Sequence, residues 1–175
     1  EVRTRETMDY ALTFAETGHL CLATLHANNA NQALDRIINF FPSDRHSQVW
    51  MDLSLNLRGM IAQQLLPTID GKGRRAAIEV LINTPLVADM IRKGEVHSLK
   101  ELMGKSNEQG MQTFDQALYA LFRTGDITYE SALAAADSAN DLRLMIKLAG
   151  NGPVVGSAAG SLSLEPNSED PERRR

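Results

Sequence analysis

Residues 16–30 read Glu-Thr-Gly-His-Leu-Cys-Leu-Ala-Thr-Leu-His-Ala-Asn-Asn-Ala, and this stretch decides the fold that the sequence predicts. Thr17-Gly18 is typical of a helix end, because glycine readily adopts the left-handed conformation that closes many helices. Leu20 to Leu25 is apolar apart from Thr24, as in a strand that helices cover on both faces of a parallel sheet. Asn28-Asn29 then offer N-cap side chains to a following helix. We therefore expect a helix end, a buried strand and a helix start, which indicates an α/β fold.

Two histidines, His19 and His26, flank this predicted strand. In α/β sheets ligands gather beyond the carboxyl ends of the strands, so His26 and Thr24 are candidates for a functional site, and His19 is a second candidate at the other end. The alternative for each histidine is a hydrogen bond that only fixes a turn. Along a strand they would point to opposite faces and, at roughly 3.3 Å per residue, stand about 20 Å apart. They cannot share a metal ion, and because His46 and His97 are isolated we expect no metal site.

The composition is that of an ordinary globular domain. The chain has 175 residues, of which 43% are hydrophobic and 23% charged, and no apolar run is long enough to cross a bilayer. The single cysteine, Cys21, lies within the predicted strand, so we expect a small buried thiol and a reducing, intracellular location. The net charge of −4 and the pI of about 5.6 argue against a broad phosphate-binding surface, so we expect no nucleic-acid partner.

Helical periodicity appears on both sides of the predicted strand. Apolar residues at helical spacing predict helices over 4–16 and 30–41, and Asn29 and Gln32 are spaced as in a capping box. Ser43 is the expected N-cap of a long third helix. The inward face of that helix would be formed by Val49, Trp50, Leu53, Leu57, Met60 and Ile61.

A β-hairpin is expected next. Asp70-Gly71-Lys72-Gly73 is strong turn chemistry between the extended runs 65–69 and 76–82. Pro67 cannot donate a hydrogen bond to a neighbouring strand, so it belongs on an edge strand or at a bulge.

Capping signals then predict a run of short helices. The first begins at Thr84-Pro85 and ends at Gly94, and the second begins at Thr113, with Gln116, and ends at Gly125. Two further helices begin at Thr128 and Asp141. The last residues are Gly, Ser, Pro and charged residues without periodicity, which is typical of a disordered tail. We therefore divide the chain into the second half of a sheet domain (1–83), a helical region (84–149) and a tail (150–175).

No complete catalytic motif can be assembled from spacing. A Ser-His-Asp arrangement is not visible, and no G-x-x-x-x-G-K-[ST] phosphate loop occurs in the chain. Residues 1–7 alone would be a charged start to a helix. Without a phosphate loop we expect the chain alone to hold no triphosphate and to be inactive.

Several segments together resemble the secretion ATPases of type II secretion systems and type IV pili. Glu1-Val2-Arg3, followed by Ala15–Leu20 and Thr24–Ala30, is similar to the Walker B segment and the histidine box of that family. The similarity continues to about residue 149. It passes through Asp35-Arg36, Phe41-Pro42, Ile61–Leu65, Ala77–Ile82 and Gly110–Asp115.

Within the family, the chain most resembles the twitching-motility retraction branch. Leu86–Glu95 occupies the place of that branch's Ala-Ile-Arg-Asn-Leu-Ile-Arg-Glu helix. The residues of this helix that we expect to meet a partner during retraction are Leu86, Met90, Ile91 and Arg92. Thr4 stands where most members carry the Walker B aspartate, and Ala27 where the histidine box usually has threonine. With the acidic-then-arginine tail, these departures favour the PilU-like members of the branch over the PilT-like ones.

The resemblance implies an α/β fold, the carboxyl-terminal half of a RecA-like P-loop NTPase domain with a helical carboxyl-terminal appendix. It also implies that Glu1 is the Walker B acid, which polarises the attacking water. His26 would contact the γ-phosphate, with His19 and Thr24 as further nucleotide-sensing residues. In the family the phosphate loop and the Mg²⁺-binding aspartates lie upstream, so we expect a carboxyl-terminal fragment, with ATP and Mg²⁺ bound mainly by residues outside it.

The function implied is ATP hydrolysis that powers type IV pilus retraction. Family members work as homo-hexamers, here expected at the cytoplasmic face of the inner membrane. The implied partners are a paralogous retraction ATPase and the inner-membrane pilus platform protein. One alternative is a pilus-assembly or type II secretion ATPase, although such proteins usually carry a tetracysteine insertion and residues 63–77 contain no cysteine. Another is a non-catalytic accessory ring subunit that tethers a partner motor, which Thr4 favours.

Overall fold

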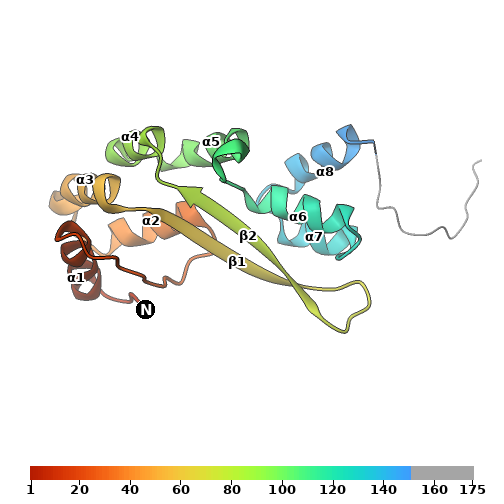
Figure 1. The fold of residues 1–175 in the computed structure, drawn as a ribbon, viewed down its shortest axis with the longest axis horizontal. Coiled ribbons are helices and arrows are strands. Elements are labelled where there is room, and N and C mark those ends of the chain that lie inside the picture. The colour runs from red at the N-terminus through yellow and green to blue at the C-terminus, as the bar shows by residue number, and fades with distance from the viewer. Residues whose placement is uncertain (151–175) are drawn as a thin grey trace, which may run out of the picture.

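A long antiparallel hairpin runs through the molecule and carries helices along most of its length, while its turn projects beyond them (Figure 1). The structure is a computed structural model that describes residues 1–150. Its elements are α1 (Arg5–Glu16), α2 (Ala30–Asn39), η1 (Ser43–Arg45), α3 (His46–Asn56), β1 (Gly59–Pro67), β2 (Arg74–Ile82), α4 (Pro85–Lys93), η2 (Val96–Ser98), α5 (Leu99–Lys105), η3 (Asn107–Gln109), α6 (Phe114–Arg123), α7 (Tyr129–Ala135) and α8 (Ala139–Leu148). The predicted tail lies, from residue 151 onward, outside the described residues.

The hairpin confirms the turn predicted at residues 70–73. β1 and β2 pair from Gly59 opposite Ile82 to Pro67 opposite Arg74, and Gly71 has the positive φ of 66° that the turn requires. Pro67 ends β1, where its missing amide interrupts no continuing strand. The hairpin is longer than predicted because β1 begins at Gly59, where a Cβ atom would lie only 2.9 Å from the Leu81 carbonyl oxygen.

The third helix is correspondingly shorter than its sequence suggests. α3 ends at Asn56, so the prediction that Met60 and Ile61 extend its inward face is wrong. Both residues pair with β2 instead, and exposed and half-buried side chains alternate along β1 as they do in a strand. Ser43 is not the N-cap either, because it begins η1 and its side chain caps neither η1 nor α3.

The central prediction from the opening stretch, a buried strand over Leu20–Leu25, is also wrong for this structure. The segment is extended but forms no strand, Leu20 and Leu22 are 80% and 88% exposed, and Cys21 is exposed as well. A central parallel strand needs a neighbour on each edge to pair its backbone groups. Within residues 1–150 the sheet consists of β1 and β2 alone, so Leu20 and Leu22 stay exposed, and only Leu25 packs against a core.

The predicted helix ends are confirmed in most places. Thr84 caps α4, Pro85 is its first residue, and Gly94 closes it in the left-handed conformation. Thr113 and Gln116 form the reciprocal capping box predicted for α6. α5, η2 and η3, which lie between these two caps, were not predicted from the sequence.

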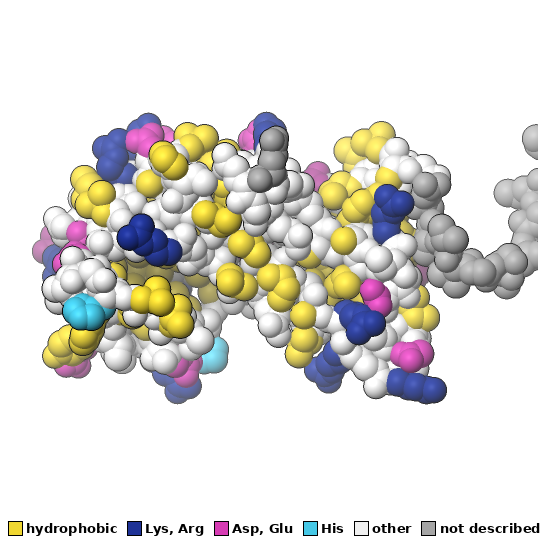
Figure 2. Space-filling view, viewed as in Figure 1, with side chains coloured by type: hydrophobic (Ala, Val, Ile, Leu, Met, Phe, Trp, Pro, Cys, Tyr) yellow, Lys and Arg dark blue, Asp and Glu magenta, His cyan; other side chains and the backbone are white. Residues whose placement is uncertain are grey.

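Two apolar cores lie along the hairpin. The first contains residues of α1 to α5 together with Leu81 of β2, and the second contains residues of α6 to α8 together with Leu66 and Ala77 of the hairpin. On the opposite side of the hairpin, apolar residues of β1 such as Ile61 and Leu65 stay exposed. Figure 2 shows yellow apolar side chains along the middle of the molecule. The division of the chain at residue 83 stays a prediction.

None of the helices within residues 1–150 has both the length and the apolar character that a bilayer crossing requires.

Candidate functional site

The first three residues lie beside the segment that carries His26. The Val2 amide donates to the Thr24 carbonyl oxygen at 2.8 Å, and the Val2 side chain is buried in the first core. Val2 therefore anchors Glu1 and Arg3 next to His26. The segments that resemble a Walker B acid and a histidine box thus meet in space.

The Glu1 carboxylate is held between an arginine and a histidine. Its Oε2 accepts a hydrogen bond from Arg3 Nη2 at 2.5 Å, and its Oε1 pairs with Nε2 of His26. The hydrogen bond from Arg3, aided by the nearby His26, lowers the pKa of Glu1 below its usual range. Glu1 is therefore ionised at neutral pH and can accept a proton or orient a water molecule. All three side chains stay partly exposed, so a ligand can reach them.

His26 is presented by a tight turn that leads directly into α2. The Ala27 amide donates to the Leu25 carbonyl oxygen at 3.1 Å, a hydrogen bond that spans His26 as in a γ-turn. Asn29 then caps α2 by accepting from the Gln32 amide at 2.9 Å. The predicted capping box is only half formed, because the Gln32 side chain accepts from Asn28 instead.

The other predicted nucleotide-sensing residues are placed differently. His19 lies at the end of α1, where its Nδ1 is 3.1 Å from Thr17 Oγ1 and its ring meets Phe14 edge-on. It pairs with neither Glu1 nor His26 within the described part of the chain. The backbone of Thr24 lies close to Glu1, because its carbonyl oxygen accepts from the Val2 amide, while the Thr24 side chain is exposed.

The residues predicted to meet a partner lie on α4. Leu86 and Arg92 are exposed, Met90 is half-buried, and Ile91 is fully buried in the first core. The accessible part of this group therefore consists of Leu86, Arg92 and an edge of Met90. Lys93 and Arg92 both contact Asp89 and lower its pKa, so the carboxylate is ionised on the same surface.

A buried carboxyl that the sequence analysis did not single out lies close to this site. Glu79, on β2, is only 1% exposed and accepts a hydrogen bond from the Ala30 amide, the first residue of α2, at 2.7 Å. Burial raises the pKa of Glu79, while the hydrogen bond from the Ala30 amide, the nearby Phe114 amide and the charge of Lys100 act in the opposite direction. The alternation of the strand could have revealed this residue, because Glu79 falls on the same inward face as Ala77 and Leu81.

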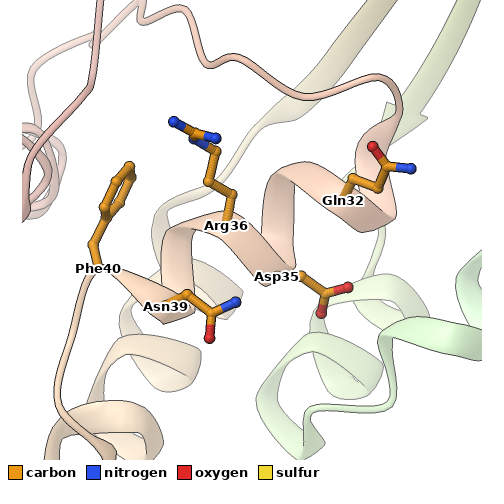
Figure 3. A pocket seen from close by; sticks show the side chains of 5 residues that line it. All are labelled: Gln32, Asp35, Arg36, Asn39 and Phe40. Atoms are coloured by element: carbon orange, nitrogen blue, oxygen red, sulfur yellow. The ribbon is translucent and has the colours of Figure 1, made fainter.

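A depression on the outer face of α2 contains none of the predicted site residues. It is lined by Gln32, Asp35, Arg36, Asn39 and Phe40 (Figure 3). The Arg36 guanidinium lies 5.8 Å from the centre of the Phe40 ring. The described residues contain no group of three or more His, Cys, Asp or Glu side chains that could hold a metal ion by themselves.

Comparison with known proteins places these features in a family. Residues 1–116 match the family described as type II/IV secretion system protein. The chain belongs to this family. The Type IV pilus ATPase PilU of Pseudomonas aeruginosa is 72% identical over 100% of the chain, which covers 46% of that protein. The retraction ATPase PilT of the same organism is 39% identical over 75% of the chain and 38% of that protein. The chain thus spans less than half the length of these relatives.

A solved structure shows the same architecture as this member of the secretion ATPase family. The structure of the pilus retraction motor PilT with bound ADP is 40% identical, has a TM-score of 0.75, and is matched over 83% of this chain and 40% of that one. This likeness confirms the predicted fold class, the carboxyl-terminal part of an α/β ATPase domain. The higher identity to PilU than to PilT confirms the preference that Thr4 and Ala27 indicated.

Proposed function

We propose that these residues are part of a hexameric ATPase that hydrolyses ATP to power type IV pilus retraction. The observation that carries the proposal is the pairing of the Glu1 carboxylate with His26, at positions similar to the family's Walker B acid and histidine box. The 72% identity to a Type IV pilus ATPase supports it. The nucleotide present in the related PilT structure supports a nucleotide substrate.

Each side chain of the site has a definite part in this reaction. Phosphoryl transfer depends mainly on positioning the nucleophile and stabilising charge. The ionised Glu1 carboxylate orients and polarises the attacking water, and the His26 ring donates a hydrogen bond to the γ-phosphate. Arg3 keeps Glu1 ionised through the hydrogen bond to Oε2. His19 and Thr24 act further out as nucleotide-sensing residues.

The site also suits a magnesium ion that is bound mostly by other groups. Mg²⁺ is commonly held by one or two carboxylates together with substrate phosphates and waters. Residues outside this chain would supply most of these ligands, and the ionised Glu1 carboxylate would add negative charge nearby. When bound, the ion neutralises developing charge on the phosphates.

The proposed assembly is a homo-hexamer at the cytoplasmic face of the inner membrane. There it acts with a paralogous retraction ATPase and with the pilus platform protein. The exposed residues of α4, Leu86 and Arg92, form the surface proposed for this contact.

The experiment that tests this function is complementation of a strain that has lost the corresponding ATPase gene. Full-length wild type should restore twitching, and so should Asp126→Asn, which alters only surface contacts of Asp126 with Arg75 and Thr124 far along the chain. Glu1→Gln and His26→Ala should not restore it, although both proteins accumulate normally. Normal twitching with both site variants would contradict the proposal.

A second candidate function is that of a non-catalytic accessory subunit. The capping role of the Thr4 side chain favours it. This side chain accepts from the Thr7 amide at 3.3 Å and completes the cap of α1, so it does not replace the aspartate that most family members carry. In that case a variant disabled in the phosphate loop would still support retraction beside an active paralogue. Loss of retraction in that variant would favour the catalytic role.

A further inference from the structure

Glu79 interrupts an otherwise apolar face of β2 at the junction of the two cores. Ala77 belongs to the second core and Leu81 to the first, and Glu79 lies between them on the same inward face. Its Oε1 accepts from Ala30, and its Oε2 is buried without a hydrogen-bond partner among the described residues. Burying a carboxyl in such a position costs free energy, so we expect its hydrogen bond to position a particular part of the backbone.

The group that Glu79 holds is the amino end of α2, directly after the histidine segment. Ala30 follows His26 by four positions, which span at most about 14 Å even when fully extended. The intervening backbone is further shortened by the turn between Leu25 and Ala27. The hydrogen bond to Glu79 therefore fixes the chain only a few residues beyond His26.

A second buried link ties the same segment to the helices at the far end of the chain. The Asn29 side chain is buried and donates from Nδ2 to Asp137 Oδ1 at 3.1 Å, just before α8. Asp137 also pairs with Lys100 of α5. Its own amide donates to Asp115 of α6 at 2.9 Å.

The amino end of α6 lies on the other side of the same carboxyl. The backbone of Gln112 pairs with Val80 on β2 at 2.8 and 3.0 Å, which brings Phe114 next to Glu79. α2 and α6 therefore both present their positive amino ends to this glutamate. The segment that carries His26 and the helices α6 to α8 share one buried polar junction.

We propose that Glu79 and Asp137 are positioning residues. They couple the position of the segment that carries His26 to the position of helices α5 to α8. The link makes the reactive geometry at Glu1 and His26 depend on how those helices sit. Its importance for catalysis rests on the proposed function. The positioning itself can be measured without ATP.

The variants are chosen to separate the hydrogen bonds from the packing. Glu79→Leu keeps most of the buried volume but loses the acceptor for Ala30, whereas Glu79→Gln keeps an acceptor oxygen. Asp137→Ala removes the acceptor for Asn29. Asp137 is less buried than Glu79, so this variant still tests the link if Glu79→Leu does not fold. Asp126→Asn is the matched control, because it removes the charge from the 2.8 Å Arg75–Asp126 pair, another link between the hairpin and the far helices.

The first measurement is amide hydrogen exchange in the full-length protein without nucleotide. In Glu79→Leu and Asp137→Ala, residues 26–33 should exchange at least about fivefold faster, while the two cores keep their protection. Glu79→Gln and Asp126→Asn should match wild type. Unchanged exchange in residues 26–33, or equally faster exchange throughout the chain, would overturn the proposal.

The second measurement is steady-state ATP hydrolysis by the same proteins. Misplacing His26 should lower kcat about tenfold in Glu79→Leu and Asp137→Ala, with KM for ATP within about twofold of wild type. Combining Glu79→Leu with His26→Ala should cost no more than His26→Ala alone, and a further additive loss would overturn the proposed route through His26. Wild-type protein without ATPase activity would contradict the proposed function, and hydrogen exchange alone would then decide the positioning.

Discussion

Glu1 and Glu79 contact neighbouring parts of one segment, yet their surroundings give them opposite properties. Glu1 is partly exposed, pairs with Arg3 and His26, and has a lowered pKa. Glu79 is buried between two cores, accepts from the Ala30 amide, and has a raised pKa. The charge at Glu1 is therefore available to a ligand. The carboxyl of Glu79 is inaccessible to a ligand and accepts a hydrogen bond from the Ala30 amide.

In such a fold, an exposed carboxylate can perform chemistry, whereas a buried carboxyl can only support the elements around it. A carboxylate that acts on water must be ionised and accessible. A buried carboxyl that joins elements must keep its acceptor whatever its charge. The two glutamates should therefore contribute differently to stability and to turnover.

The largest effect on stability is expected for Glu79→Ala. The variant leaves the Ala30 amide unpaired and creates a cavity between the cores, so the free energy of unfolding should fall by about 2–4 kcal/mol. Urea unfolding followed by circular dichroism would measure it. The matched variant Glu1→Ala should lower the midpoint far less, because Glu1 is screened by solvent. Equal losses in both variants would remove the distinction between the two sites.

The pH dependence of stability should have opposite signs for the two glutamates. Because burial raises the folded-state pKa of Glu79, its penalty is absent below the unfolded-state pKa and grows as the pH rises through the folded-state pKa. Relative to wild type, Glu79→Gln should therefore gain melting temperature as the pH rises above the unfolded-state pKa of about 4.

Glu1→Gln should show the opposite trend. The Arg3 hydrogen bond lowers the pKa of Glu1, so its stabilisation is present above the unfolded-state pKa and lost as the pH falls through the folded-state pKa. Relative to wild type, this variant should lose melting temperature as the pH rises, by less than Glu79→Gln gains, because solvent screens Glu1. Parallel curves for the two variants would contradict the assigned environments.

The smallest effects are expected at the helix caps near each glutamate. Thr113 and Thr4 both form reciprocal capping boxes, one beside Glu79 and one after Glu1. Thr113→Ala should cost about 1 kcal/mol in the free energy of unfolding, and Thr4→Ala, at an exposed helix start, about 0.5 kcal/mol. Thermal unfolding of both variants would measure the costs. A larger loss for Thr4→Ala would mean that the amino-terminal region contributes more than its exposure indicates.

Local signals in the sequence predicted the parts of the fold that local chemistry determines. Thr84, Gly94 and the Thr113–Gln116 pair act within one helical turn, so their roles can be inferred without knowing the rest of the structure. The hairpin turn at Gly71 is similarly local.

The errors concern features that depend on distant partners. Leu20–Leu25 has the composition of a central strand, but within residues 1–150 no neighbouring strand is present to pair with it. Met60 and Ile61 fit helical spacing, but pairing with β2 makes them part of a strand. The meeting of Glu1 and His26 could be anticipated only from resemblance, since no local spacing brings residues 25 positions apart together.

The most direct test of the central claim compares the two glutamate-to-glutamine variants in one assay. Steady-state ATP hydrolysis by the full-length protein should fall about 100-fold or more in Glu1→Gln, because the acid that polarises the water is lost. It should stay within about twofold of wild type in Glu79→Gln, because an acceptor for Ala30 remains. Wild-type turnover by Glu1→Gln would contradict the account.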